Sequence, residues 1–273
     1  MTTVVATDLD GTLLFSQRAM AAGSRRPPAK DLVPVDVEGG RTYAYMTTAV
    51  IRDWARLAGA GALVPATTRS VPQYRRLRLP GPPPHIAIVC NGARLLVGGE
   101  AEPAWEHRVR RRMRGGVAFD VVWREATGWY HRHPFAALRA VEDLFMYLTV
   151  RERADWLTDV AAQAAAWAGG VGWRASLQGR KLYLLPRTLD KAAAVAHAAE
   201  RLAADRLVAG GDSLLDAGML RAADAAIRPA HGELHSTGFA LPHCRTTREA
   251  GAAAGDEIIA WYGSQIHAAR LAI

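Results

Sequence analysis

Short apolar segments alternate with helix-forming segments at both ends of this 273-residue chain, and no other feature constrains its fold as strongly. The apolar segments predict strands, and the amphipathic, Ala-rich segments predict helices. We expect strands at residues 4–7, 62–66, 85–90, 182–185 and 207–209, and helices at 47–57, 191–204 and 251–271. Such alternation is typical of an α/β fold, here a doubly wound, Rossmann-like parallel sheet. Ligands bind such sheets beyond the carboxyl ends of the strands.

The middle of the chain has a different pattern. Most of its 8 tryptophans lie between residues 93 and 180, with hairpin-like strands expected at 94–97 and 116–122 and helices at 135–148 and 151–167. We therefore predict a core of residues 1–92 and 186–273 with an inserted α+β cap of residues 93–185. Within the core, residues 33–45 predict a hairpin, with Glu38-Gly39-Gly40 at its turn.

Two carboxylates stand at the end of the first predicted strand. The segment Val4-Val5-Ala6-Thr7-Asp8-Leu9-Asp10-Gly11-Thr12 becomes acidic at Asp8. Side chains alternate along a strand, so Asp8 and Asp10 should leave it on the same side. Close carboxylates repel each other, and the pair therefore favours a bound cation or a shared proton. Taken alone, the segment would be a strand followed by an ordinary turn.

Further polar groups follow the ends of later strands. Thr67 follows the second strand, Lys191 opens a predicted helix, and Asp212 and Asp216 flank the turn after residues 207–209. Taken singly, these would be a helix cap, a surface lysine and an acidic helix start. Together they provide a carboxylate nucleophile, a hydroxyl donor, a cation and an acidic cluster, which is the set that phosphoryl transfer requires.

These residues make the chain resemble the haloacid dehalogenase superfamily of phosphatases. Its four motifs are matched in order by Asp8-Leu9-Asp10-Gly11-Thr12, by Thr67, by Lys191 and by Gly211-Asp212-Ser213-Leu214-Leu215-Asp216. Asn91-Gly92-Ala93 and the position of the insertion resemble the type IIB subfamily, which includes Cof-type sugar phosphatases and sucrose-phosphate phosphatases. The chain has Thr67-Thr68-Arg69 where that subfamily often has Thr-Gly-Arg, and Leu215-Asp216 where it often has Asn-Asp.

The resemblance implies a role for each of these residues. Asp8 would be the nucleophile that forms an aspartyl-phosphate, and Asp10 the general acid and base. Thr67 would bind a phosphoryl oxygen, and Lys191 would neutralise Asp8. Mg²⁺ is the implied cofactor, and its site would comprise Asp8, the Asp10 backbone carbonyl, Asp212 and, through the second shell or a water, Asp216. Substrate contacts are expected at Thr68, Arg69, Asn91 and Gly92.

The predicted activity is hydrolysis of a small phosphorylated metabolite, with a sugar phosphate as one candidate. A nucleotide or nucleic-acid-end phosphatase is an alternative that only the net charge of +8 and the arginine run 108–114 suggest. A solvated, charged segment explains that run better than a site for an anionic substrate or for nucleic acid does. A non-catalytic binding or regulatory protein is the other alternative, and the complete acid set argues against it. The sequence does not specify the oligomeric state.

Composition constrains the cellular compartment in which we expect this protein. No segment approaches the roughly 20 uninterrupted apolar residues that cross a membrane, so we expect no membrane partner. Cys90 and Cys244 form neither a disulfide framework nor a zinc motif. A reducing compartment suits this cysteine usage, and we predict a cytoplasmic protein.

Overall fold

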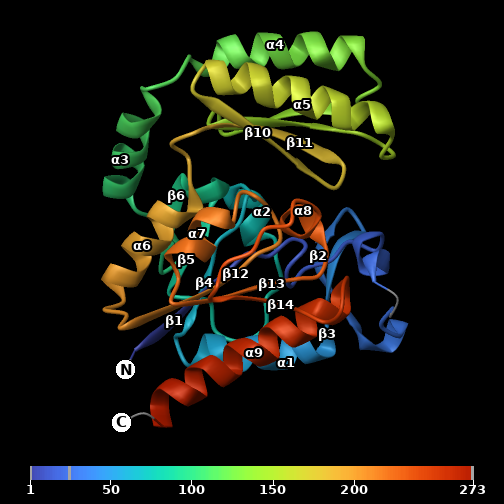
Figure 1. The fold of residues 1–273 in the computed structure, drawn as a ribbon. Helices are drawn as coiled ribbons and strands as arrows, with labels where there is room; N and C mark the ends of the chain where they lie inside the picture. The colour runs from blue at the N-terminus through green and yellow to red at the C-terminus, as the bar shows by residue number, and fades with distance from the viewer. Residues whose placement is uncertain (1, 24–25, 272–273) are drawn as a thin grey trace. The chain divides into compact units, whose positions relative to one another are not determined.

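The computed structural model describes residues 2–23 and 26–271 (Figure 1). The chain divides into two compact units. The core unit comprises the residues up to Glu102 and those from Lys191 onward, and the inserted unit comprises Pro103–Asp190. The sequence predicts the first boundary ten residues earlier, at residue 93. The observed boundary lies later because β6 (Arg94–Val97) pairs antiparallel with β5 (Ile86–Val89) and so belongs to the core unit.

A five-stranded, wholly parallel sheet forms the centre of the core unit. Its order is β14-β13-β12-β1-β4, and its strands are β1 (Thr3–Thr7), β4 (Leu63–Pro65), β12 (Arg206–Gly210), β13 (Ala225–Arg228) and β14 (Cys244–Thr246). All five residues of β1 are buried, and Val5 pairs with both Leu63 and Val208. The apolar N-terminal segment therefore becomes a central strand, as an α/β fold requires.

Helices cover both faces of this sheet. α1 (Thr48–Gly59) packs against α9 (Ala252–Leu271) on one side, and α6 (Lys191–Arg201) packs against α7 (Ala217–Ala222) on the other (Figure 1). Val50, Trp54 and Leu57 recur at helical spacing and are buried in the core. Thr47 caps α1, since its hydroxyl accepts the backbone N–H of Val50. The helices predicted at 47–57, 191–204 and 251–271 are thereby confirmed, with small shifts at their ends.

Smaller elements complete the core unit. The predicted hairpin is confirmed as β2 (Leu32–Glu38) and β3 (Arg41–Thr47). β5 is a strand as predicted, but it belongs to a separate antiparallel sheet with β6 and β7 (Glu100–Ala101), and one bridge, Ala66 to Ile88, links it to the end of β4. Short helical turns are η1 (Ala19–Ala22), η2 (Ala29–Asp31), α2 (Val71–Arg75), η3 (Cys90–Gly92) and α8 (Gly232–Ser236).

The inserted unit has an antiparallel sheet covered by two helices. The order is β10-β11-β9-β8, formed by β8 (Ala137–Val141), β9 (Phe145–Thr149), β10 (Trp173–Gln178) and β11 (Lys181–Pro186). α4 (Phe119–Arg132) and α5 (Asp155–Gly170) pack on it through Val122, Leu157 and Val160. α3 (Pro103–Met113) precedes them in the chain. This architecture agrees with the predicted α+β composition.

Three local predictions in this unit were wrong. Residues 135–148 form the hairpin β8–β9 rather than a helix, because Glu142 and Asp143 adopt positive φ angles of 49° and 53° and reverse the chain. Residues 116–122 contain the start of α4 rather than a strand, since Val122, Ala126 and Trp129 share a buried helical face. Residues 182–185 are a strand, β11, but it lies in the antiparallel sheet.

None of the described helices is both long enough and apolar enough to cross a bilayer.

Candidate active site

The parallel register brings distant polar residues to one edge of the sheet. Thr7 ends β1 and pairs with Gly210 of β12 and Pro65 of β4, so the three strands stop together. Asp8 follows β1 directly, and its N–H donates to the Gly210 carbonyl (2.8 Å). Thr67 and Asp212 each lie two residues beyond β4 and β12. Carboxyl ends of parallel strands are where such sheets bind ligands, so this edge is the candidate site.

A buried lysine joins two of the carboxylates. Lys191 Nζ lies 2.6 Å from Asp8 Oδ1 and 2.6 Å from Asp216 Oδ1. The lysine and Asp216 are 1% and 0% exposed, so the contacts are desolvated. Thr12 Oγ1 donates to the other Asp8 oxygen at 3.0 Å. Asp8 is thus held at both oxygens while it remains at the open edge of the sheet.

The acidic cluster carries more negative charge than the lysine can balance. One carboxylate oxygen from each of Asp8, Asp212 and Asp216 lies within 4.8 Å of the others. Asp216 Oδ2 also accepts the N–H and the hydroxyl of Ser213, so both of its oxygens are engaged within the protein. No donor of the described residues hydrogen-bonds the Asp212 carboxylate. A hard cation bound between Asp8 and Asp212 would satisfy this excess, which fits Mg²⁺.

Burial and repulsion within the cluster shift the pKa values of its groups. Burial raises the pKa of Asp8 to about 7; Lys191 opposes this rise, and Asp216 adds to it. Burial, and then the charges of Asp8 and Asp216, also raise the pKa of Asp212. Burial alone would lower the pKa of Lys191, but Asp216 and Asp8 outweigh it and raise the pKa. The lysine therefore stays cationic, and a divalent cation would stabilise the ionised carboxylates.

Arg69 holds Asp10, the second carboxylate of the first motif. Its Nε and Nη2 bind the two oxygens of Asp10 at 2.7 Å each, in a bidentate ion pair. Its Nη1 binds Asp36 Oδ2, and Asp36 Oδ1 accepts Arg76 Nε at 2.7 Å. Burial alone would raise the pKa of Asp36, but the hydrogen bonds from Arg76 and Arg69 lower it.

The expected substrate residues lie in one pair of linked turns. Asn91 donates its N–H to the Thr67 carbonyl (2.9 Å), and Cys90 donates to the Arg69 carbonyl (2.8 Å). Asn91 has a left-handed φ of 54° and is buried with Gly92. Thr67 Oγ1 accepts the Arg69 N–H (3.1 Å), and its own N–H donates to Ile88. The structure thus places Thr68 between two residues that hydrogen-bond this turn.

Three further residues of this region, Asp36, Arg76 and His231, were not predicted from the sequence. Asp36 is a charged residue among apolar neighbours in a hairpin strand, and its burial at 1% follows from the two arginines. His231 Nδ1 accepts the Gly251 N–H, so its Nε2 carries the proton that binds the Gly11 carbonyl (2.8 Å). No local pattern marks His231, since both contacts come from distant parts of the chain.

Solved structures share the fold of this chain over nearly its whole length. The sucrose-phosphatase of Synechocystis sp. PCC6803, in complex with sucrose and phosphate, has a TM-score of 0.65 at 15% identity, covering 96% of this chain and 98% of that one. This chain has the haloacid dehalogenase fold. A trehalose-6-phosphate phosphatase related protein matches with a TM-score of 0.56 at 15% identity, covering 96% and 99% of the two chains.

A third solved structure extends the comparison. BT1666 of Bacteroides thetaiotaomicron, described among the phosphatases of the HAD superfamily, has a TM-score of 0.51 at 15% identity, covering 98% of this chain and 95% of that one. No protein-family model matches this chain, and no curated protein matches its sequence. Likeness at this identity establishes the fold, and the activity has to be inferred from the site.

Proposed function

We propose that this protein is a Mg²⁺-dependent phosphatase that hydrolyses a small phosphorylated metabolite through an aspartyl-phosphate. The observation that carries the proposal is the environment of Asp8, a carboxylate held by Lys191 and Thr12 beside the unpaired Asp212. A nucleophile fixed in this way and balanced by cations suits in-line attack on phosphorus. The haloacid dehalogenase fold of the chain supports the same chemistry.

The first step transfers the phosphoryl group to the protein. An Asp8 oxygen forms a bond to phosphorus as the ester P–O bond breaks, and Asp10 gives its proton to the leaving oxygen. Lys191 stabilises the charge that develops on the equatorial oxygens, and the Thr67 hydroxyl donates to one of them. Asp8, Asp212 and the Asp10 backbone carbonyl would hold Mg²⁺, which neutralises charge on the carboxylate and the phosphoryl group.

The second step regenerates the carboxylate. Asp10 now takes a proton from water, whose oxygen attacks phosphorus and releases inorganic phosphate from Asp8. Arg69 keeps the Asp10 carboxylate in one orientation through two parallel hydrogen bonds. Asp216 acts indirectly, because its oxygens hold Lys191 and Ser213. Two displacements with one proton out and one proton in leave the protein unchanged.

The substrate is proposed at the level of a class. A sugar phosphate is the first class to test, since one similar structure contains sucrose and phosphate and another is a trehalose-6-phosphate phosphatase related protein. Thr68, Asn91 and Gly92 are proposed to contact it from the linked turns next to Thr67.

Release of 4-nitrophenol from 4-nitrophenyl phosphate, with Mg²⁺ or with EDTA, tests the proposal. We expect Mg²⁺-dependent turnover that Asp8→Asn abolishes and that Asp53→Asn, a partly buried carboxylate of α1 paired with Arg52, leaves unchanged. Turnover that survives Asp8→Asn would refute the nucleophile. Absence of turnover in the unaltered protein, with all phosphate esters of a metabolite panel, would favour a non-catalytic binding protein.

A further inference from the structure

Helix α3 carries a group of arginines that the proposed reaction does not use. Arg108, Arg111 and Arg112 are all exposed. Arg110 of the same helix pairs with Glu106 (3.8 Å), but no carboxylate of the described residues lies within ion-pair distance of the other three. The helix therefore carries a concentrated positive charge that its own protein does not neutralise.

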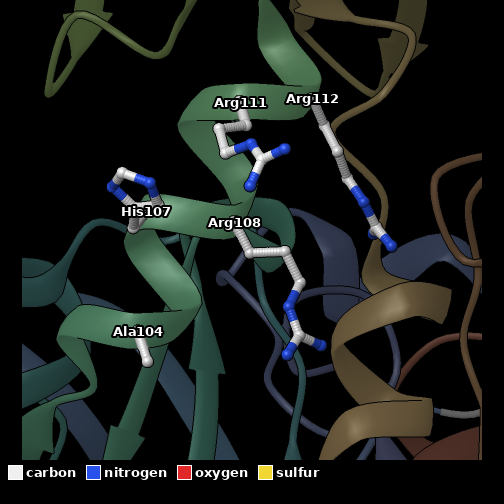
Figure 2. A pocket seen from close by; sticks show the side chains of 5 residues that line it. All are labelled: Ala104, His107, Arg108, Arg111 and Arg112. Atoms are coloured by element: carbon white, nitrogen blue, oxygen red, sulfur yellow. The ribbon is translucent and has the colours of Figure 1, made fainter.

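The unpaired arginines line a pocket. Ala104, His107, Arg108, Arg111 and Arg112 border a space of about 490 Å³ (Figure 2). Their spacing of three and four residues places them on neighbouring turns of α3. Figure 2 shows the Arg108 and Arg112 side chains extending to the same side of the helix, whereas His107 points to the opposite side.

One of these guanidinium groups is partly ordered by a neighbouring aromatic ring. The Arg108 guanidinium lies over the Trp105 ring, 5.6 Å from the centroid, and Trp105 is only 2% exposed. A cation held over a buried indole loses less conformational freedom when it binds an anion. Arg108 is thus better ordered for binding than an ordinary surface arginine.

The arrangement is unfavourable without an anion. Like charges four residues apart, such as Arg108 and Arg112, destabilise a helix. The carbonyl end of α3 offsets this repulsion for residues in its last turn, which include Arg112, but Arg108 lies one turn earlier. A negative ligand between the two side chains would relieve the repulsion.

We propose that this α3 pocket is a binding site for a small oxyanion with several negative charges, such as a compound with two or more phosphate groups. The proposal does not depend on phosphatase activity, because it rests on residues outside the Asp8 site. A small ligand is favoured over nucleic acid because the unpaired guanidinium groups gather at one pocket, whereas nucleic-acid binding uses an extended track of cations.

Calorimetric titration of the full chain with tripolyphosphate, in EDTA, tests the site. We expect saturable binding that weakens at least tenfold in the double variant Arg108→Gln/Arg112→Gln. The matched control is Arg110→Gln/Arg114→Gln, which removes the same two charges from the same segment. Arg110 is already paired with Glu106, and neither residue lines the pocket, so the control should keep its affinity within about threefold.

Three results would overturn the proposal. The first is no binding of tripolyphosphate to the unaltered chain. The second is an equal loss in the two double variants, which would reveal a general charge effect. The third is tighter binding of a twelve-residue oligothymidylate, weakened equally in both variants, which would identify a nucleic-acid surface instead. Circular dichroism is the control for folding. Each variant should give the spectrum of the unaltered chain, since all four positions are exposed.

Discussion

Lys191 Nζ lies 2.6 Å from Asp8 Oδ1, although the two residues are 183 positions apart in the chain. Both are buried, and the same ammonium group contacts Asp216 at 2.6 Å. One cation therefore positions the proposed nucleophile and balances the acidic cluster. Its replacement should affect stability as well as turnover, and the two effects can be measured separately.

Lys191→Met is expected to lower the free energy of unfolding by about 3 kcal/mol, since it leaves buried carboxylates without their cation. Turnover of 4-nitrophenyl phosphate should fall by at least 10³-fold, as for the loss of a group that stabilises transition-state charge. Urea denaturation and steady-state kinetics measure the two quantities. A variant with unchanged stability would show that the Lys191 contacts are not maintained in solution.

Asp36→Asn should weaken proton donation by Asp10, although residue 36 itself does not contact the substrate in the proposed reaction. The change removes a charge that holds Arg69 and Arg76, so the Asp10 carboxylate loses its fixed orientation. An alkyl phosphate needs protonation of its leaving oxygen more than 4-nitrophenyl phosphate does. We therefore expect kcat to fall about tenfold more for the alkyl ester than for the aryl ester.

Glu38→Gln is the control for that experiment, because Glu38 pairs with Arg76 from the same hairpin but is 59% exposed. It should slow neither ester appreciably. An equal loss on both esters in Asp36→Asn would indicate general damage to the fold rather than an effect on Asp10.

Gly11→Ala should disrupt the acidic cluster by collision. An added Cβ would lie 2.5 Å from Asp212 Oδ2, and the φ of +87° disfavours any side chain. Gly39→Ala is the matched control, since its φ is also positive, at +56°, but no atom lies within 4 Å of the added Cβ. Both variants should lose about 1 kcal/mol to backbone strain, and only Gly11→Ala should lose turnover.

Mg²⁺ should raise the thermal midpoint of the protein, because a ligand that binds only the folded state stabilises it. The shift should grow as the pH rises through about 7, where Asp8 loses its proton to solvent. Asp212→Asn should abolish the shift, whereas Asp120→Asn, an exposed site on α4, should retain it. A full shift in Asp212→Asn would place the cation elsewhere. Differential scanning calorimetry with Mg²⁺ or EDTA provides the measurement.

His231 should make stability dependent on pH. Burial lowers its pKa below the ordinary 6.5; the bond to the Gly11 carbonyl opposes this shift, and His235 adds to it. The unfolded chain therefore takes up a proton first, so this contribution is present above pH 6.5 and is lost as the pH falls below it. We expect the unaltered protein to lose about 1 kcal/mol more than His231→Gln between pH 7.5 and 5.5.

Urea denaturation at the two pH values measures this difference. His107→Gln, at an exposed position on α3, should behave like the unaltered protein. Parallel losses in the unaltered protein and His231→Gln would show that another group titrates.

The central sheet and the acidic cluster could be predicted because both depend on local patterns. Asp8 and Asp212 each follow an apolar strand, and parallel strands end at a common edge. The pairing of Arg69 with Asp10 could not be predicted, since it depends on side-chain directions across 59 residues. The structure shows ion pairs of Arg69 with Asp10 and Asp36, and the contact of Arg69 with substrate that the sequence predicts stays a prediction.

The inserted unit was less predictable for a different reason. Glu142 and Asp143 form the turn of β8–β9 with positive φ angles, which glycine or asparagine would have signalled. Without that signal, the apolar residues of 135–148 are also compatible with a helix. The predicted boundary at residue 93 left β6 outside the core. The pairing of β6 with β5 depends on an antiparallel register, which the periodicity of the sequence does not reveal.

The register of β1 has a consequence for how this protein is synthesised. Thr3 pairs with Arg206 and Thr7 with Gly210, so β1 cannot pair with β12 until about 200 further residues have been made. A nascent chain leaving the ribosome exposes the apolar β1 until residues 206–210 have emerged, and closing so long a loop is slow. The inserted unit lies wholly within that interval and can fold before the sheet closes. The protein therefore gains its acidic cluster only after Asp212 and Asp216 have been made, well after the inserted unit.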